Sequence, residues 1–456
     1  MFSEVQHIHL IGIGGIGMSA LAKLFLLQGK QVTGSDLHIG EITRDLVARG
    51  AVIQKGHAVS NLPSQAEFVI HSPAVPDTNP EYQLAKELGL PVLSYAEALG
   101  ELSKHYSTIV VTGTHGKSTT TAMIGLILEA AGYDPTVILG SFVPSFAHGN
   151  LRVGSGRFLV IEGCEHQANM LHLHPEMIVL TSIEADHLDF YRTLENIRIA
   201  FQTFVDRLSG MGLVIVNADD PVSQTLHIAN PVRYGSDVQA HYHQRARTVA
   251  QGLQSVEIHR LVPKEALGTL SLQVPGAFNV SNALAAIAAA MELGIPFETC
   301  VRALGSFPGI WRRFERVGEV QGAPIISDYG HHPTAVRVTL QAARELFPNR
   351  RIILCFQPHQ HARTEALFED FVTALSEADA LVLSEIYRVD GRTEQETISS
   401  QHLVDAISLK RPDLTVRFAP DFEEAQKGIM GLLDSQSVVI IQGAGTIDEL
   451  ARQMVR

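Results

Sequence analysis

The sequence has few cysteines and no long apolar run. Only three of its 456 residues are cysteine, at Cys164, Cys300 and Cys355, and their wide spacing matches neither a disulfide framework nor a zinc site. No stretch approaches the roughly 20 continuous apolar residues of a membrane span. The N-terminus shows no basic segment followed by an apolar one, so no secretory signal is expected. These absences predict a cytoplasmic protein that does not use a membrane as a partner.

Basic residues are also too few to balance the acidic ones. The chain carries 35 lysines and arginines against 48 aspartates and glutamates, a formal charge of −13. Without a basic stripe, this charge argues against nucleic acid as a partner. It does not exclude an anionic small molecule, because clustered backbone N–H groups and a few arginines can bind phosphate inside an acidic protein. The sequence leaves the oligomeric state open.

The chain is too long for a single hydrophobic core. With 45% hydrophobic and 18% charged residues, it has the composition of a globular protein, and its length suggests three domains. Apolar strand-like runs alternate with helical patterns, which is typical of an α/β class. We predict a Rossmann-like domain over residues 1–103, a central P-loop ATPase-like α/β domain over 104–316 and a second Rossmann-like α/β domain over 317–456.

Hydrophobic periodicity and turn residues locate the expected elements. Strands are expected at residues 7–11, 31–36, 67–71, 109–111, 136–140, 157–163, 176–184, 212–220, 324–330, 351–357, 380–387, 415–419 and 437–445. Helices are expected at residues 42–49, 82–88, 95–103, 194–208, 333–346, 365–376, 401–409, 423–433 and 447–455. Residues 231–274 suggest a small antiparallel layer. The Ala-rich helix after it should be capped near Asn279 and stop at Gly294, and a connector is expected at 307–318.

The stretch TGTHGKSTTTAMIG, residues 112–125, organises the central segment. An apolar strand leads into Gly113-x-x-Gly116-Lys117-Ser118, and a helical pattern follows. Strand, glycine turn and helix together direct backbone N–H groups and the positive end of a helix dipole at one point, which suits a phosphate. Lys117 could then reach the outer phosphates, and the Ser118 hydroxyl could ligate Mg²⁺.

This loop is shorter than the usual Gly-x-x-x-x-Gly-Lys-Ser/Thr, whose first glycine would fall at Val111. The alternative is an ordinary strand-to-helix turn with a solvated lysine. We favour a nucleoside-triphosphate site, because two glycines and a lysine precede the unbroken hydroxyl run of residues 118–121.

A second glycine loop lies near the N-terminus. The strand at 7–11 leads into Gly12-x-Gly14-x-x-Gly17, and a second strand ends in Asp36, at about the distance where a Rossmann acidic residue meets a ribose. The functional interpretation is that a diphosphate binds at the helix N-terminus. NAD is only one of the molecules that contain a diphosphate. The alternative is a tight turn without a ligand.

Acidic residues and a histidine follow two further strands of the central segment. Glu162 ends one strand and Glu165 follows in the loop, and a second strand is followed by Glu184, Asp186, His187 and Asp189. Carboxyl ends of strands face the ligand crevice of open α/β sheets, where MgATP needs oxygen ligands and an imidazole could serve a second metal. Taken singly, each of these residues could equally be a solvated charge or a helix cap.

Taken in order, nine motifs resemble the Mur ligase family of bacterial cell-wall synthesis, and they span nearly the whole chain. They are GIGGIGMS, TGSD, GTHGKSTTT, IEADHLDFY, NALAAIA, RRFE, DYGHHPT, QPH with the following RT, and GAGTID. The resemblance implies that the first domain holds the diphosphate of a UDP-sugar and the second binds ATP. The third domain would close over both ligands and bind the amino acid that is added.

The same resemblance implies roles for individual residues. Catalytic roles fall to Lys117, His187 and Arg313, and two Mg²⁺ ions would be held by Ser118, Glu162 and His187. ATP contacts are implied for Gly113, Thr114, Gly116, Lys117, Ser118, Thr119, Asn282, Arg313 and Asp328. UDP-sugar contacts are implied for Gly14, Gly15, Gly17, Asp36 and Ser72, and amino-acid contacts for Tyr329, His331, His359 and Arg363.

The implied reaction is ATP-dependent joining of L-alanine to the lactyl carboxylate of UDP-N-acetylmuramate, a step of peptidoglycan synthesis. Family members that add later residues use a carbamylated lysine, but this sequence has no lysine between Lys117 and Lys264, which favours the alanine-adding branch. Gly163, Cys164, Ala335, Gln360 and His361 depart from the family pattern.

Three alternatives remain at this stage. A murein peptide ligase would join a recycled peptide to the same sugar nucleotide. An NAD-dependent dehydrogenase would use the first glycine loop but leave the Lys117 loop unexplained. A catalytically silent sensor would bind UDP-sugar and ATP without turnover.

Overall fold

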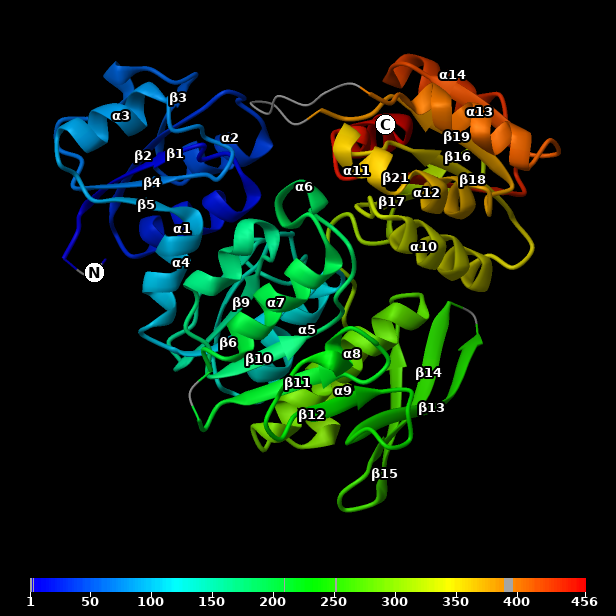
Figure 1. Cartoon of the computed structure of the whole chain (residues 1–456), viewed down its shortest axis with the longest axis horizontal. Coiled ribbons are helices and arrows are strands. Elements are labelled where there is room, and N and C mark those ends of the chain that lie inside the picture. Colours follow the sequence, from blue (N-terminus) through cyan, green and yellow to red (C-terminus); the bar gives the residue numbers. More distant parts are fainter. Residues whose placement is uncertain (1, 3, 209, 251, 389–396) are drawn as a thin grey trace. The chain divides into compact units, whose positions relative to one another are not determined.

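The computed structural model describes residues 2, 4–208, 210–250, 252–388 and 397–456. Their strands form three sheets with helices against the faces (Figure 1), which confirms the predicted α/β class. The chain divides into two compact units. The first comprises Met1–Ser182, Arg198–Tyr234 and Ala285–Cys300, and the second comprises Ile183–Ile197, Gly235–Leu284 and Val301–Arg456. The predicted domain limits at residues 103 and 316 stay a prediction.

The N-terminal sheet is parallel and has the order β3-β2-β1-β4-β5. Its elements are β1 (His7–Ile11), α1 (Ile16–Leu27), β2 (Gln31–Asp36), α2 (Glu41–Ala48), β3 (Val52–Lys55), η1 (Val59–Asn61), β4 (Phe68–His71), α3 (Pro80–Glu87), β5 (Val92–Ser94) and α4 (Tyr95–Ser103). The strand order reverses between β1 and β4. Doubly wound sheets bind ligands beyond the carboxyl ends of the strands at such a point.

The first unit also contains a mostly parallel sheet in the order β12-β11-β10-β6-β9-β7-β8. Its elements are β6 (Ser107–Thr112), α5 (Lys117–Ala130), β7 (Thr136–Ile138), β8 (Leu151–Arg152), β9 (Phe158–Gly163), η2 (His166–His172), β10 (Met177–Leu180), α7 (Leu194–Val205), β11 (Leu213–Asn217), η3 (Ser223–Thr225) and β12 (Val232–Gly235). Thr112 pairs with Gly163 of β9 and with Leu180 of β10. The carboxyl ends of these three strands therefore lie level.

The predicted antiparallel layer is confirmed in the second unit. It consists of β13 (Tyr242–Ala250), β14 (Leu253–Arg260) and β15 (Glu265–Leu272), which pair in sequence order. The remaining elements before the third sheet are α6 (Leu188–Tyr191), α8 (Ala277–Glu292) and α9 (Phe297–Gly305).

The C-terminal sheet has the order β16-β17-β21-β18-β19-β20, and only β16 runs antiparallel. Its elements are β16 (Glu315–Val320), β17 (Ala323–Asp328), α10 (Pro333–Leu346), β18 (Arg351–Phe356), α11 (His361–Ala366), α12 (Phe368–Leu375), β19 (Ala380–Ser384), α13 (Ser400–Lys410), β20 (Thr415–Ala419), α14 (Phe422–Met430), β21 (Ser437–Gln442) and α15 (Ile447–Met454).

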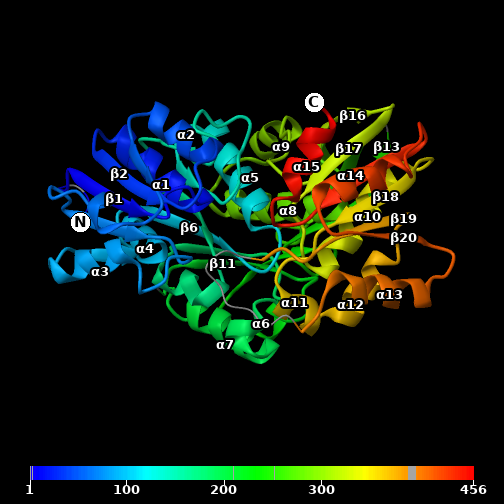
Figure 2. The ribbon, with the colours of Figure 1, turned by 90° about the horizontal axis from the view of Figure 1, so that it is seen from above.

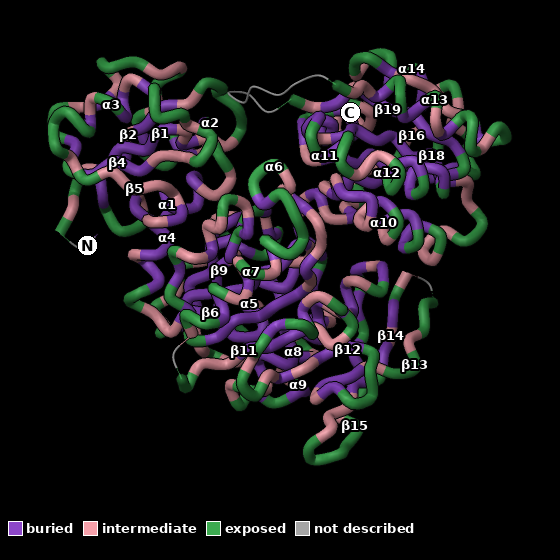
Figure 3. The backbone as a smooth tube through the Cα atoms, viewed as in Figure 1, coloured by how far each residue is buried: buried purple, intermediate pink, exposed green. Residues whose placement is uncertain are grey.

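Two apolar cores enclose this sheet. One packs under α10, α12 and α13, and the other under α14 and α15, on the opposite face (Figure 2). The central strands β18 and β21 are buried along almost their whole length (Figure 3). Burial on both faces explains why these strands read as continuous apolar runs rather than as alternating patterns.

Several local predictions differ from the structure. Four strands end three or four residues before the expected limit, at Leu180, Asn217, Ser384 and Gln442. The helix expected to be capped near Asn279 begins two residues earlier, at Ala277, and the Asn279 amide donates back to the Pro275 carbonyl at 2.7 Å. The helix expected at 365–376 is two helices, which meet at Leu367 (φ −114°, ψ 25°). Part of the expected connector at 307–318 is strand, because residues from Glu315 onward pair with β17.

In the part of the chain that the structure describes, no helix is both long enough and apolar enough to cross a membrane.

Candidate functional site

Two glycines shape the loop between β6 and α5. Gly113 has φ of +132°, and Gly116, which caps α5, has φ of +81°; this region of the backbone map favours glycine. A Cβ on Gly113 would lie 2.2 Å from Thr181 Oγ1 and 2.8 Å from the Ser182 nitrogen. The missing side chain therefore lets the loop approach the end of β10.

Backbone hydrogen bonds hold the loop in that position. The Thr114 N–H donates to the Ser182 carbonyl at 2.7 Å, and the His115 N–H donates to Ser182 Oγ at 3.3 Å. The first N–H groups of α5, which starts at Lys117, have no acceptor within the helix and carry the positive end of its dipole. The predicted strand, glycine turn and helix are all present, in an arrangement suited to phosphate.

The Lys117 ammonium lies against this loop. Its Nζ donates to the carbonyls of Gly113 (2.6 Å) and Thr114 (3.1 Å) and pairs with the Glu165 carboxylate at 2.8 Å. Burial acts to lower the pKa of Lys117, but the charge and hydrogen bond of Glu165 together with other nearby acidic groups, Glu162 among them, outweigh it and the pKa is raised. The ammonium therefore keeps its charge in a largely enclosed position.

Ser118 and Glu162 are suitable ligands for Mg²⁺ beside this loop. Ser118 is the second residue of α5, and Glu162 lies in β9, paired with Val111 of the neighbouring β6. The Gly140 N–H donates to Glu162 Oε1 at 2.8 Å and orients the carboxylate. Hydroxyl and carboxylate oxygens are the hard ligands that Mg²⁺ prefers, so the donor set fits the expected ion.

The N-terminal glycine loop is held by the end of β2. The N–H groups of Gly12 and Ile13 donate to the Ser35 carbonyl at 2.8 and 3.1 Å. The Gly14 N–H donates to Asp36 Oδ2 at 2.8 Å. Asp36, expected beside the uridine, thus also fixes the loop that would bind the diphosphate.

The remaining residues assigned to the UDP-sugar surround the start of α1. Gly15 is the N-cap of α1, and a Cβ on Gly17 would lie 2.6 Å from the Tyr95 ring. Ser72 follows β4, and its N–H donates to the Ile11 carbonyl at 2.9 Å. These positions lie at the strand-order reversal of the sheet, where such a ligand is expected.

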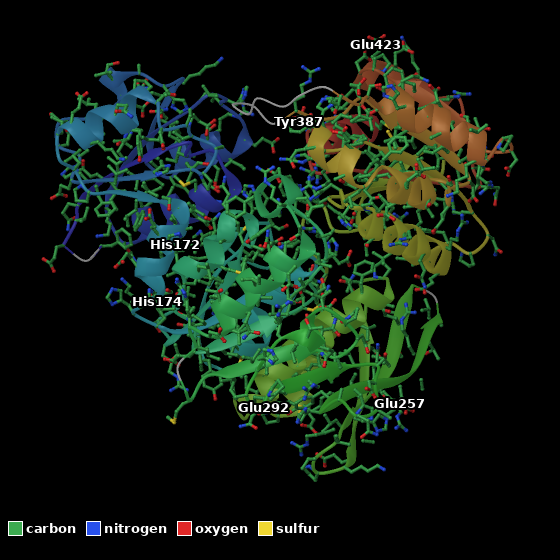
Figure 4. All side chains as sticks on the ribbon, in the orientation of Figure 1. His172, His174, Glu257, Glu292, Tyr387 and Glu423 are labelled. Carbon is green, nitrogen blue, oxygen red and sulfur yellow. The ribbon has the colours of Figure 1, made fainter. Side chains whose placement is uncertain are left out.

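A buried cluster of charged and imidazole groups lies in the second unit. Arg363 Nε donates to Asp186 Oδ1 at 2.8 Å, and Arg363 Nη1 contacts His359 Nδ1 at 3.1 Å. His331 Nε2 lies 4.0 Å from Asp186 Oδ2. The His359 ring stacks on that of Tyr387, with centroids 5.5 Å apart; Tyr387 is labelled in Figure 4. Three residues assigned to the amino acid, Arg363, His331 and His359, therefore come together.

The protonation states in this cluster follow from its charges. Burial acts to raise the pKa of Asp186, but the Arg363 and His187 charges hold it well below its usual range. Burial and the Arg363 charge hold the pKa of His331 well below its usual value, with Asp186 opposing them. At neutral pH the cluster contains an ionised Asp186 and a neutral His331.

A small pocket lies beside the pair of Asp186 and Arg363, with a volume of about 10 Å³, close to the space that one water molecule needs. Its lining residues are Ala185, Asp186, His187, Leu188, Asp189, Gln360, Ala362, Arg363, Ala366 and Leu367. The lining combines one cation, carboxylates and small apolar side chains, so it suits a small polar ligand.

His187 lies at the rim of this cluster in a left-handed conformation. Its φ is +53°, it caps α6, and its N–H donates to Asp186 Oδ1 at 2.7 Å. Positive φ is uncommon for a side chain other than glycine and is often found at functional sites.

Tyr329, which follows β17, and Arg313, which precedes β16, lie together. The Arg313 guanidinium is 4.7 Å and that of Arg312 is 4.9 Å from the Tyr329 ring centroid. Arg312 is buried and donates to the Gly443 and Gly445 carbonyls at 2.6 and 2.8 Å. Arg312, which had no expected role, thereby ties this segment to the end of β21.

The contacts that the structure shows for Asp328 and Asn282 are with protein groups. Asp328 accepts hydrogen bonds from the backbone N–H groups of Phe314 and Gly330 and from Gln442 Nε2, at 2.8–2.9 Å. The Asn282 amide donates to Asn279 Oδ1 at 3.2 Å. Their assignments to the ribose and adenine of ATP stay predictions.

The sequence alone did not predict two of the ion pairs at these sites. Glu165 and Asp186 were noted only as acidic residues near strand ends, but they are the counterions of Lys117 and Arg363. Asp186 and Arg363 are 177 residues apart. Their positions after strand ends were a visible signal in the sequence, but the pairing requires the fold.

Models of one protein family match almost the whole chain. The Mur ligase family catalytic domain matches residues 7–107, the Mur ligase middle domain matches 111–290, and the Mur ligase glutamate ligase domain matches 312–445.

Full-length relatives and solved structures agree with these models. A protein from Acidithiobacillus ferrooxidans named UDP-N-acetylmuramate–L-alanine ligase is 41% identical over 460 residues, which cover 99% of this chain and 98% of that protein. The structure of a UDP-N-acetylmuramate-alanine ligase from Thermotoga maritima matches with a TM-score of 0.85 and 32% identity over 98% of both chains. A murein peptide ligase from Psychrobacter arcticus matches with a TM-score of 0.73 at 23% identity over 98% of both chains, a likeness of fold.

Replacing Gly113 with Ala should weaken MgATP binding about 10- to 100-fold, because overpacking of this size typically costs about 1–3 kcal/mol. Gly132→Ala is the matched control. Gly132 also has positive φ (+81°), but a Cβ there has no atom within 4 Å, so it should change stability and not affinity. Calorimetric titration with MgATP would measure both variants, and equal affinities would contradict the close approach at Gly113.

Proposed function

The chain belongs to the Mur ligase family, and on that premise we propose that it joins L-alanine to the lactyl carboxylate of UDP-N-acetylmuramate with hydrolysis of ATP to ADP. The observation that carries this proposal is the Lys117 loop, a charged lysine on a glycine turn at a helix N-terminus. It is supported by relatives of that name that match this chain from end to end. The reaction would take place in the cytoplasm.

The proposed reaction has two steps. The lactyl carboxylate attacks the γ-phosphorus of ATP and becomes an acyl phosphate while ADP leaves. The ammonium group of L-alanine first loses a proton. The resulting amine attacks the acyl carbon, the acyl C–O bond breaks, phosphate departs, and the nitrogen loses a second proton to solvent. Both steps concentrate negative charge, and preorganised positive groups lower such barriers.

Lys117 and the N–H groups of its loop would hold the β- and γ-phosphates. Before ATP binds, Glu165 would act as the counterion that holds Lys117 in place. Gly113, Thr114, Gly116, Ser118, Thr119, Asn282, Arg313 and Asp328 complete the proposed ATP site. Ser118, Glu162 and His187 would hold Mg²⁺, which supplies Lewis-acid stabilisation of phosphate charge.

The N-terminal domain would hold UDP-N-acetylmuramate at its glycine loop. Gly14, Gly15 and Gly17 would contact the diphosphate, with Asp36 and Ser72 beside them. The Ser35 and Asp36 hydrogen bonds that fix this loop support the proposal, since a preformed loop loses less entropy on binding.

The pocket beside Asp186 and Arg363 suits the zwitterion of an amino acid. Arg363 would bind the alanine carboxylate, and the ionised Asp186 would receive the ammonium group. The methyl group would lie against small apolar side chains such as Ala362 and Ala366. Tyr329, His331 and His359 would complete this site.

A murein peptide ligase is the second candidate. Solved structures of ligases that join a murein peptide match at 23% identity over 98% of this chain and at 27% over 68% of it, whereas relatives named for L-alanine reach 41% over the full chain. An NAD-dependent dehydrogenase leaves the Lys117 loop without a use.

Phosphate release distinguishes these candidates directly. With MgATP and UDP-N-acetylmuramate present, L-alanine should give the highest kcat/KM, and the murein tripeptide should give little above background. Glycine and L-serine serve as the test of pocket size. Faster turnover with the tripeptide would favour the second candidate, and no turnover with any acceptor would favour a silent sensor.

Lys117→Ala should lower kcat by about 100- to 1000-fold, the cost of removing one group that stabilises transition-state charge. Affinity for UDP-N-acetylmuramate should not change. Lys104→Ala is the control, because Lys104 is an exposed residue of the same unit that pairs with Glu101. Near-normal ligase activity of Lys117→Ala would contradict the assignment of this loop.

Arg363→Ala should raise the KM for L-alanine at least about 30-fold, since breaking a buried charge pair costs roughly 2–5 kcal/mol, and should leave the KM for ATP unchanged. Arg344→Ala removes an exposed arginine paired with Asp379 and should have little effect. Steady-state kinetics with each substrate varied in turn measures this. An unchanged KM for L-alanine would show that the amino acid binds elsewhere.

A further inference from the structure

A buried polar network in the N-terminal domain is used by none of the roles above. Its centre is the Glu81 side chain of α3, which is 0% exposed. Oε2 accepts hydrogen bonds from His9 Nε2 and Ser35 Oγ, both at 2.7 Å. Oε1 accepts from the Ala58 N–H at 3.1 Å and from Asn61 Nδ2 at 3.0 Å. One carboxylate thus joins β1, β2, α3 and the segment after β3.

The protonation pattern of this network follows from Ser35. Its single hydroxyl proton goes to Glu81, so its oxygen must accept from His57 Nδ1, which lies 2.9 Å away. Ser35 is therefore held from both sides, and its χ1 angle is determined by Glu81 and His57 together.

Ser35 also holds the glycine loop through backbone hydrogen bonds. Its carbonyl accepts the N–H groups of Gly12 and Ile13, and Asp36, the next residue, accepts from Gly14. The Gly56 N–H donates to the Asp36 carbonyl at 2.8 Å, immediately before His57. The loop that would bind the diphosphate thus rests on a strand end that Glu81 anchors from behind.

An ionised carboxylate suits this position. Burial acts to raise the pKa of Glu81, but hydrogen bonds from His9, Ser35 and Asn61 hold it below its usual value. Desolvating a carboxylate is costly unless its lone pairs are satisfied, and here both oxygens are. Glutamine in its place would turn an NH₂ group toward two of the four donors, so each of these two must change its tautomer or rotate, or lose its partner.

We propose that Glu81 is a positioning residue for the UDP-sugar site, acting through Ser35 to hold the glycine loop and Asp36 in the geometry that binds the diphosphate. This inference rests on the proposed function. It differs from a purely structural role, because a network that only stabilised the domain would alter folding without affecting one substrate selectively.

The test is Glu81→Gln in the full-length protein, with kinetics for all three substrates. The KM for UDP-N-acetylmuramate should rise about 10- to 100-fold, the size of effect that removal of an outer-shell partner has on ligand binding. The kcat at saturation and the KM values for ATP and L-alanine should stay within about twofold of wild type.

Glu67→Gln is the matched control. Glu67 also accepts two backbone hydrogen bonds, from the N–H groups of Gln6 and His7, but it does so at the amino end of β1, away from the glycine loop. It should leave every KM unchanged. A KM for UDP-N-acetylmuramate that is normal in Glu81→Gln, or a uniform loss across all three substrates, would overturn the inference.

Ser35→Ala decides the matter if Glu81→Gln does not fold. This substitution removes the link between Glu81 and the loop and leaves the carboxylate three hydrogen-bond donors. The KM for UDP-N-acetylmuramate should therefore rise in this variant too. An unchanged KM overturns the inference. Wild-type protein without turnover or UDP-N-acetylmuramate binding would instead refute the proposed function, which keeps the two failures apart.

Discussion

The account depends on a charged lysine held on a glycine turn. Lys117 can remain an ammonium in its enclosed position because the Glu165 carboxylate lies 2.8 Å away, and an unpaired buried charge would be prohibitively costly. The turn itself exists because Gly113 allows backbone within contact distance of Thr181 and Ser182. The pairing keeps a cation in place for a phosphate, which would take over the role of Glu165 on binding.

The same physical logic places the other two candidate sites. Each lies at the carboxyl ends of parallel strands, where backbone N–H groups and strand-end side chains converge. In the first domain the end of β2 supports a glycine loop through Ser35 and Asp36. In the second unit Asp186 and Arg363 form an oppositely charged pair that an amino-acid zwitterion complements. Each site therefore has its charged groups arranged before a substrate arrives.

Many of the helices and strands could be predicted from the local sequence pattern. Strands such as β1 and β2 and helices such as α4 and α10 have the predicted bounds, because their periodicity and terminal residues agree. The break at Leu367 and the start of α8 before Asn279 were not predicted, since tertiary packing decides such boundaries. The pairing of Asp186 with Arg363 and the Glu81 network join residues far apart in sequence. No local pattern encodes such contacts.

The central claim is that the lactyl carboxylate of the sugar nucleotide accepts the γ-phosphoryl group of ATP. The amine of the amino acid then displaces phosphate from the resulting acyl phosphate. UDP-N-acetylmuramate labelled with ¹⁸O in both lactyl carboxylate oxygens tests this most directly, with mass analysis of the phosphate and the amide product. The account predicts one ¹⁸O atom in the released phosphate and one in the new amide. Phosphate without label, formed alongside an amide product, would contradict it.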